Sequence, residues 1–257
     1  MISPLANVSP KAIIGKNVTI EAFATVYDDV EIGDNTHIHP NALIYPDTII
    51  GHNCQIFPGA VIGIVSQDLK YNGEKSNTVI GNNTIIREYV TVHKGTADRM
   101  TTKIGDNCLI MAYVHIAHDC IIGNNVIIAN YTGLAGHVTI EDFVIVEGMG
   151  AIQQFVTIGK HSFLAGGSKV RKNVPPYIRV AREPLQYIGV NTIGLARRGF
   201  EKEIISQIED IYRLIFVRGH SISNALEIVN QEIIDSTIRN EIVEFIKNSQ
   251  DGIIKGI

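Results

Sequence analysis

Branched aliphatic residues recur every six positions along the first two-thirds of the chain. Steps of six from Ile2 to Val170 give 29 positions, and 26 of them are Ile, Leu or Val. A period of six matches neither an amphipathic helix nor a flat two-sided strand. It is typical of a parallel β-helix, in which short strands stack into a continuous coil.

A second row of positions lies two residues before each aliphatic and is usually small or β-branched, as at Ala12 and Thr36. We expect both rows to point inward, so that bulky and small side chains together fill a narrow interior. The three cysteines fall on the small row, and we therefore interpret them as core residues and not as reactive thiols. They are Cys54, Cys108 and Cys120.

A corner motif, Ile-Gly-x-Asn, recurs on a slower period. Copies such as Ile14–Asn17 and Ile32–Asn35 are 18 residues apart, which predicts three six-residue units per coil. Gly and Asn tolerate the positive φ that a tight corner needs. Two intervals between successive copies are longer than 18 residues by whole six-residue units. This predicts loops at residues 63–78 and 94–101 that leave the core register unchanged.

The six-residue period stops at Val170, and Pro175-Pro176 follows. Beyond it, apolar stripes predict helices over residues 200–216, 223–234 and 236–246, the last two opened by a Ser. A further helix is expected around residues 184–198. We thus predict a β-helix over residues 1–175 and a C-terminal α-helical domain over residues 176–257.

Charge and composition exclude several classes of function. Lys and Arg number 22 and Asp and Glu 26, so the net charge of −4 offers no general attraction for nucleic acid. No apolar run reaches the length of a membrane span, and no signal peptide is evident at the N-terminus. With only three cysteines, the chain is expected to be cytoplasmic.

Histidines gather near one predicted corner. His118 and Asp119 fall at a coil corner, on its expected outer side, and His137 should lie on the next rung. His93 and His115 are a little more than one coil apart. The cluster has three interpretations: solvated surface imidazoles, a zinc site, or a general base whose tautomer a carboxylate fixes. No Ser or Cys stands beside it in a nucleophile context, which favours direct transfer to a substrate hydroxyl.

Two charged segments could bind a substrate. Gln67 to Lys70, in the longer predicted loop, combines an amide with both charges, which suits a sugar or a phosphate. Residues 160–198 carry eight basic side chains opposed only by Glu183. We expect a local basic patch for an acidic protein or a phosphorylated ligand. Its members are Lys160, Lys169, Arg171, Lys172, Arg179, Arg182, Arg197 and Arg198.

Several motifs together resemble one family over essentially the whole chain. They are QDLKY at 67–71, HIAHDC at 115–120, LAGHV at 134–138, VPPY at 174–177, GVN at 189–191 and RRGF at 197–200. This combination resembles the acyl-carrier-protein–UDP-N-acetylglucosamine O-acyltransferases, which perform the first step of lipid A synthesis. The resemblance implies a homotrimer of left-handed parallel β-helices with active sites between subunits.

The resemblance also implies the reaction. A 3-hydroxyacyl group would move from the phosphopantetheine thioester of acyl carrier protein to the 3-hydroxyl of UDP-N-acetylglucosamine, with no cofactor or metal of the enzyme's own. His118 would be the general base, Asp119 its support, and the Gly136 N–H an oxyanion donor. Further contacts to sugar nucleotide, acyl chain or carrier protein are implied for Gln67, Asp68, Lys70, His93, His115, His137, Gln154, Gly166, Asn191, Arg197 and Arg198.

Two departures concern the acyl preference, which the sequence leaves open. Gln153 stands where the family often has His, and Arg182-Glu183-Pro184 replaces a segment that holds another family His. Three alternatives share the same coil: a γ-type carbonic anhydrase, which is a zinc enzyme; another hexapeptide-repeat acyltransferase; and a purely structural β-helix. A structural β-helix would not need loops that break the period at Asp68 and Asp98. The related N-acyltransferase has an extra N-terminal domain, for which a repeat beginning at Ile2 leaves no room.

Overall fold

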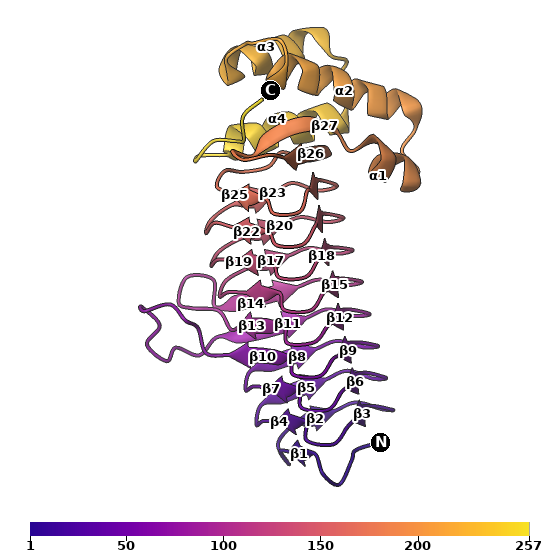
Figure 1. The fold of residues 1–257 in the computed structure, drawn as a ribbon, viewed down its shortest axis with the longest axis vertical. Coiled ribbons are helices and arrows are strands. Elements are labelled where there is room, and N and C mark those ends of the chain that lie inside the picture. Colours follow the sequence, from indigo (N-terminus) through magenta and orange to yellow (C-terminus); the bar gives the residue numbers. More distant parts are fainter. Residues whose placement is uncertain (257) are drawn as a thin grey trace.

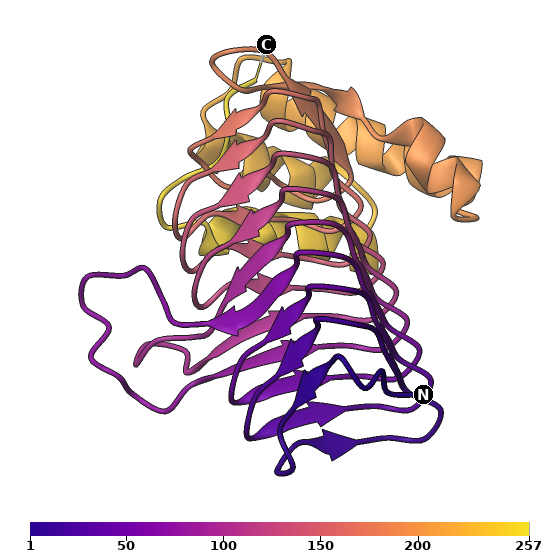
Figure 2. The same ribbon diagram turned by 60° about the horizontal axis from the view of Figure 1, so that its bottom comes forward.

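The computed structural model describes residues 1–256. Short strands stack into three sheets that form the sides of a triangular coil, and the helices gather at its C-terminal end (Figures 1 and 2). The first sheet consists of β1 (Asn7–Val8), β4 (Thr25–Val26), β7 (Leu43–Ile44), β10 (Val61–Ile64), β13 (Thr91–His93), β16 (His115–Ile116), β19 (Gly133–Leu134), β22 (Ala151–Ile152) and β25 (Lys169–Val170).

The other two sheets complete the triangle. The second sheet consists of β2 (Ile13–Ile14), β5 (Val30–Ile32), β8 (Thr48–Ile50), β11 (Asn77–Ile80), β14 (Thr101–Ile104), β17 (Ile121–Ile122), β20 (Thr139–Ile140) and β23 (Thr157–Ile158). The third consists of β3 (Thr19–Ile20), β6 (His37–Ile38), β9 (Gln55–Ile56), β12 (Ile85–Ile86), β15 (Leu109–Ile110), β18 (Ile127–Ile128), β21 (Ile145–Val146), β24 (Phe163–Leu164), β26 (Ile178–Ala181) and β27 (Gln186–Val190).

The strand register confirms the 18-residue coil. His115 pairs with Gly133 in a parallel ladder, one coil further on. Across the longer loop Thr48 pairs with Thr78, so the inserted residues leave the ladder intact. The two loops leave the same side of the coil between β10 and β11 and between β13 and β14 (Figure 1).

The inward rows form the core as predicted. Aliphatics such as Ile38, Ile86 and Ile116 are fully buried. The three cysteines are free and buried. Burial raises the pKa of Cys108 to about 11 and that of Cys120 to about 12, so neither thiol ionises at neutral pH. Their interpretation as core residues is confirmed.

The C-terminal part differs from the prediction in one element. Residues 186–190, expected to be helical, form β27, which pairs antiparallel with β26, and α1 spans only Thr192–Arg197. The edge of β26 offers unpaired backbone groups, and pairing with them outweighs local helix preference. The division at residue 175 stays a prediction, because the third sheet continues past it through β26.

The remaining helices match their predicted positions. They are α2 (Lys202–Phe216), α3 (Ile222–Glu232) and α4 (Thr237–Asn248). Ser236 caps α4 as expected, whereas α3 is capped by Ser221 and not by Ser223. The Tyr212 hydroxyl of α2 donates to the Pro176 carbonyl at 2.7 Å, which ties the helices to the last coil. Within residues 1–256, no helix is long and apolar enough to cross a membrane.

Candidate active site

A cleft of about 940 Å³ runs along the first sheet beneath the longer loop. Gln67, Asp68 and Lys70 form one side of it, and the small residues Gly133 and Ala151 lie on strands β19 and β22 beneath it. It is also lined by His115, His118, His137, Gln153, Gln154, Phe155, Lys169 and Arg171. Many of the residues expected to contact substrates thus meet in one cleft.

His118 lies at the corner between the first and second sheets. Its Nδ1 is 2.9 Å from Oδ2 of Asp119, and its Nε2 is 3.9 Å from Oδ2 of Asp68 across the cleft. The ring of His137 meets it edge-on at 4.9 Å between centroids, so the two histidines lie on adjacent rungs as predicted. The side chain is about nine-tenths buried, which limits the positions that its ring can take.

Asp119 faces the shorter loop on the outer side of the coil, as expected, but it is fully buried there. The shorter loop folds over it: its Oδ1 accepts from the backbone N–H groups of Thr96 and Arg99, at 3.0 and 3.2 Å, and its Oδ2 accepts from the Thr96 hydroxyl. Burial acts to raise the pKa of Asp119, but these hydrogen bonds and that of His118 outweigh it and hold the pKa below its usual value. The carboxylate is therefore ionised at neutral pH beside the imidazole.

Gly136 packs against the face of His118. A Cβ at this position would lie 2.5 Å from Cε1 and 2.6 Å from Nε2 of the ring, so only glycine allows this approach. Within residues 1–256 the Gly136 N–H donates no hydrogen bond. The backbone of Gly136, with its free N–H, thus lies beside the ring of His118.

His93 and His115 form a second pair of rings, edge to face at 5.1 Å between centroids. His115 lines the cleft, whereas His93 is buried behind it and its Nδ1 lies 2.7 Å from the Val65 carbonyl. Burial lowers the pKa of both rings, and a neighbouring histidine lowers each pKa further: His118 acts on His93, and His93 acts on His115. Both rings are therefore neutral at pH 7, and His93 supports the cleft without lining it.

A second pocket, of about 400 Å³, lies on the third sheet and holds Asn191, Arg197 and Arg198. Asn191 caps α1 and donates from Nδ2 to the His161 carbonyl at 2.8 Å. The guanidinium of Arg198 lies 5.3 Å from the Phe143 ring, and within residues 1–256 its buried Nη1 has no hydrogen-bond partner. Burial lowers the pKa of Arg198. A half-buried guanidinium with an unpaired buried nitrogen favours binding of an anion.

The basic residues of 160–198 do not form one patch. Lys160 pairs with Glu241 near the second sheet, Lys169 and Arg171 pair with Glu183 beside the cleft, and Arg179 lines the pocket on the third sheet. The coil spreads neighbouring positions over three faces because each six-residue unit turns a corner.

Gly166 lies at the corner between the third and first sheets, outside the cleft residues. Its N–H donates to Oε2 of Glu147 at 2.9 Å. A Cβ there would make only ordinary contact, 3.4 Å from the Gly148 carbonyl oxygen. A side chain at position 166 is thus sterically possible and would project from an exposed corner.

Comparison with known proteins identifies the family of the chain. Residues 173–254 match the model of domain 2 of UDP-N-acetylglucosamine O-acyltransferase, and residues 11–46, 29–64 and 101–136 match the bacterial transferase hexapeptide model. An acyl-[acyl-carrier-protein]–UDP-N-acetylglucosamine O-acyltransferase of Aliivibrio fischeri is 44% identical over 99% of this chain and 100% of its own length. The chain belongs to the UDP-N-acetylglucosamine O-acyltransferase family.

Solved structures of this acyltransferase family superpose on nearly the whole chain. A UDP-N-acetylglucosamine acyltransferase from Bacteroides fragilis gives a TM-score of 0.98 at 46% identity, covering 99% of this chain and 100% of that one. The enzyme from Francisella novicida gives 0.96 at 38% identity, covering 99% and 94%. The fold is the left-handed parallel β-helix with C-terminal helices that the resemblance implies.

One cluster in the cleft has the composition of a metal site. Donor atoms of His118, Asp119 and His137 lie within 4.8 Å of one another. The four acceptor positions of the Asp119 carboxylate, however, are taken by two N–H groups, a hydroxyl and the ring of His118. Because no lone pair is left for a cation, the cluster suits a general base better than zinc.

The sequence did not single out the residues of the shorter loop that complete this site. Thr96 and Arg99 bind Asp119, and Asp98 lies 2.9 Å from Nδ1 of His137. The available signal was the break in the six-residue period at Asp98, which marks residues that the core does not need. This break locates the loop but does not show that the loop contacts Asp119 and His137.

Proposed function

We propose that this chain transfers a 3-hydroxyacyl group from acyl carrier protein to the 3-hydroxyl of UDP-N-acetylglucosamine, with His118 as general base. The observation that carries the proposal is the arrangement at the cleft: His118 is bonded to a buried Asp119 and packed against the free amide of Gly136. The family's named activity requires a base and an oxyanion donor close together.

The proposed reaction is one displacement through a tetrahedral intermediate. Nε2 of His118 takes the proton of the sugar hydroxyl while the hydroxyl oxygen attacks the thioester carbonyl carbon. The Gly136 N–H donates to the resulting oxyanion. The C–S bond then breaks, and the proton on His118 passes to the departing thiolate. Asp119 holds Nδ1 as the proton donor and stabilises the imidazolium that forms.

We assign the sugar nucleotide to two surfaces. Gln67, Asp68 and Lys70 would hold it from the longer loop, whereas Arg198 would bind its phosphates from the pocket on the third sheet. These surfaces lie on different sides of one coil. A threefold assembly would turn the third sheet of one subunit toward the first sheet of the next, which supports the homotrimer with active sites between subunits.

Subunit mixing tests this arrangement. His118→Ala and Arg198→Ala chains would be unfolded, mixed in equal amounts, refolded together and assayed at a sugar-nucleotide concentration well below KM, where each variant alone should keep at most about a tenth of wild-type activity. With random assembly, every mixed trimer has one site with both residues intact, which restores about a quarter of wild-type activity. No restoration in mixed trimers would place both residues of a site on one chain.

The partner and the absence of a metal are part of the proposal. The exposed Arg197 would contact the acidic carrier protein, and His115, His137, Gln154 and Gly166 would contact the acyl donor, with His93 behind them.

No metal or cofactor is needed beyond the carrier's phosphopantetheine. Chelator-treated enzyme should keep full activity, and loss restored by stoichiometric zinc would favour an anhydrase-like site. We place the enzyme in the cytoplasm, which the three free buried thiols support.

The decisive test of the reaction is the product. Purified enzyme, UDP-N-acetylglucosamine and a panel of 3-hydroxyacyl carrier proteins should yield a sugar nucleotide heavier by one hydroxyacyl group, located by mass spectrometry on the 3-oxygen. A product acylated elsewhere, or none with any chain length, would contradict the proposal.

A further inference from the structure

Two histidines lie on the same outer face of the third sheet, far down the coil from the cleft. His37 and His39 flank the buried Ile38 at strand β6, and residues two apart on an extended strand share one face. Glu21 follows β3 on the preceding coil, 18 residues before His39. Three potential metal ligands from two adjacent rungs are thus brought together.

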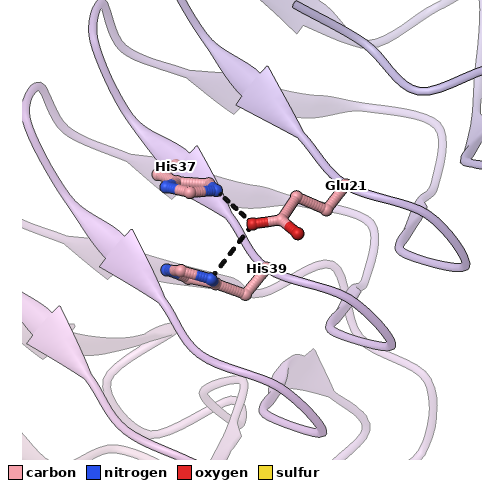
Figure 3. A group of neighbouring side chains, drawn as sticks. All are labelled: Glu21, His37 and His39. Atoms are coloured by element: carbon pink, nitrogen blue, oxygen red, sulfur yellow. Dashed lines mark hydrogen bonds and ion pairs between the residues drawn. The ribbon is translucent and has the colours of Figure 1, made fainter.

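Both imidazoles converge on one oxygen (Figure 3). Nε2 of His37 lies 2.5 Å and Nδ1 of His39 lies 3.2 Å from Oε1 of Glu21. One donor atom from each residue falls within 4.8 Å of the others. The side chains of His37, His39 and Glu21 are 35%, 20% and 37% exposed, so an ion could enter from solvent.

Surrounding contacts hold these side chains in place. The rings of His37 and His39 stack at 3.9 Å between centroids, and His39 stacks on Phe57 of the next coil at 4.5 Å. The Glu21 backbone N–H donates to the Ile38 carbonyl at 2.9 Å. Because these contacts already position the two rings and the backbone of Glu21, little ordering remains for a ligand to impose.

The carboxylate of Glu21 has an oxygen free to bind a metal ion, unlike the carboxylate of Asp119 in the cleft. Oε2 of Glu21 accepts no hydrogen bond within residues 1–256, whereas all acceptor positions of Asp119 are occupied. Two imidazoles with one carboxylate are a ligand set typical of Zn²⁺ and of related divalent transition metals, and water can complete the coordination.

We propose that Glu21, His37 and His39 bind one divalent transition-metal ion, with Zn²⁺ as the best match. The ion would replace the contacts of His37 and His39 with Oε1 of Glu21. It would thereby cross-link the coils of β3 and β6 near the N-terminal end. Its role is structural, since none of its three ligands lines the cleft. This proposal does not depend on the acyl transfer.

Zinc titration of chelator-treated, full-length protein tests the site. Calorimetry should show one Zn²⁺ bound per chain at this site. Mutation of a residue that only supports a metal ligand can already weaken metal binding about 10-fold. Glu21→Gln or His37→Asn removes a ligand itself and should therefore weaken zinc binding more than roughly 10-fold. His220→Asn, a histidine remote from the cluster, is the matched control and should bind as the wild type does. His118→Asn should also keep the site.

Two results would overturn the proposal: unchanged zinc binding in Glu21→Gln, or binding that is lost in His118→Asn instead. Acyltransferase activity verifies the fold of the Glu21 and His37 variants, because neither residue lies in the cleft. Co²⁺ provides a second measurement, since the visible absorption bands of the bound ion should disappear in Glu21→Gln and persist in His220→Asn.

Discussion

Replacement of Gly136 by Ala should impair catalysis by moving the ring of His118. The new methyl carbon would lie 2.5 Å from Cε1 of His118, whereas an ordinary contact between carbon atoms needs about 3.5 Å, so the ring must withdraw by about 1 Å. It cannot withdraw freely, because Nδ1 is held at 2.9 Å by Asp119 and the His137 ring lies 4.9 Å away. A misplacement of about 1 Å can cost roughly 100-fold in rate.

The assay is kcat for transfer from a 3-hydroxyacyl carrier protein to UDP-N-acetylglucosamine, with the melting temperature measured alongside. Gly133→Ala is the matched control, since its Cβ meets nothing within 4 Å although Gly133 lines the same cleft. We expect a loss of roughly 100-fold for Gly136→Ala and little change for the control. Equal kcat values in two folded variants would refute the reasoning, because the position of the ring would not matter.

Three further predictions concern other parts of the molecule. Gly166→Met should shift selectivity toward shorter acyl chains in a competition assay, whereas an equal loss on every chain length would make Gly166 a backbone requirement. Arg198→Met should raise KM for the sugar nucleotide at least about 10-fold without lowering the melting temperature, because the guanidinium it removes is half-buried and leaves its buried Nη1 without a hydrogen-bond partner. His161, stacked between Phe143 and Tyr177, has a pKa lowered to about 4 by burial and by the nearby cations. Since the unfolded chain takes up this proton first, stability should fall by roughly 3 kcal/mol between about pH 6.5 and 4, and His161→Phe should remove that part of the loss in thermal unfolding.

The coil could be predicted from the sequence because each of its rules is local. One buried aliphatic every six residues and a positive φ at each corner specify the rung, and the ladder then repeats it. Asn17, Asn35 and Asn53 show the corner conformation that their residue type favours. The same corner also accepts His137 and Phe155, which composition alone does not predict.

The site was less predictable because its contacts are long-range. The periodicity places His118 and His137 on adjacent rungs, but it cannot show that Thr96 and Arg99 fold back over Asp119. The resemblance assigned Arg198 to the same site as His118, although one chain holds them on different sheets. Strand β27 was missed since its partner β26 exists only in the folded coil.

The central claim is that His118 is the base that activates the sugar hydroxyl. The most direct measurement is the single-turnover rate of acyl transfer by His118→Ala, with carrier protein and sugar nucleotide both saturating and with the trimer verified. Loss of a general base should lower this rate by about 10²–10⁴-fold. A folded variant that keeps more than about a tenth of the wild-type rate would contradict the claim, because catalysis would then not depend on this proton acceptor.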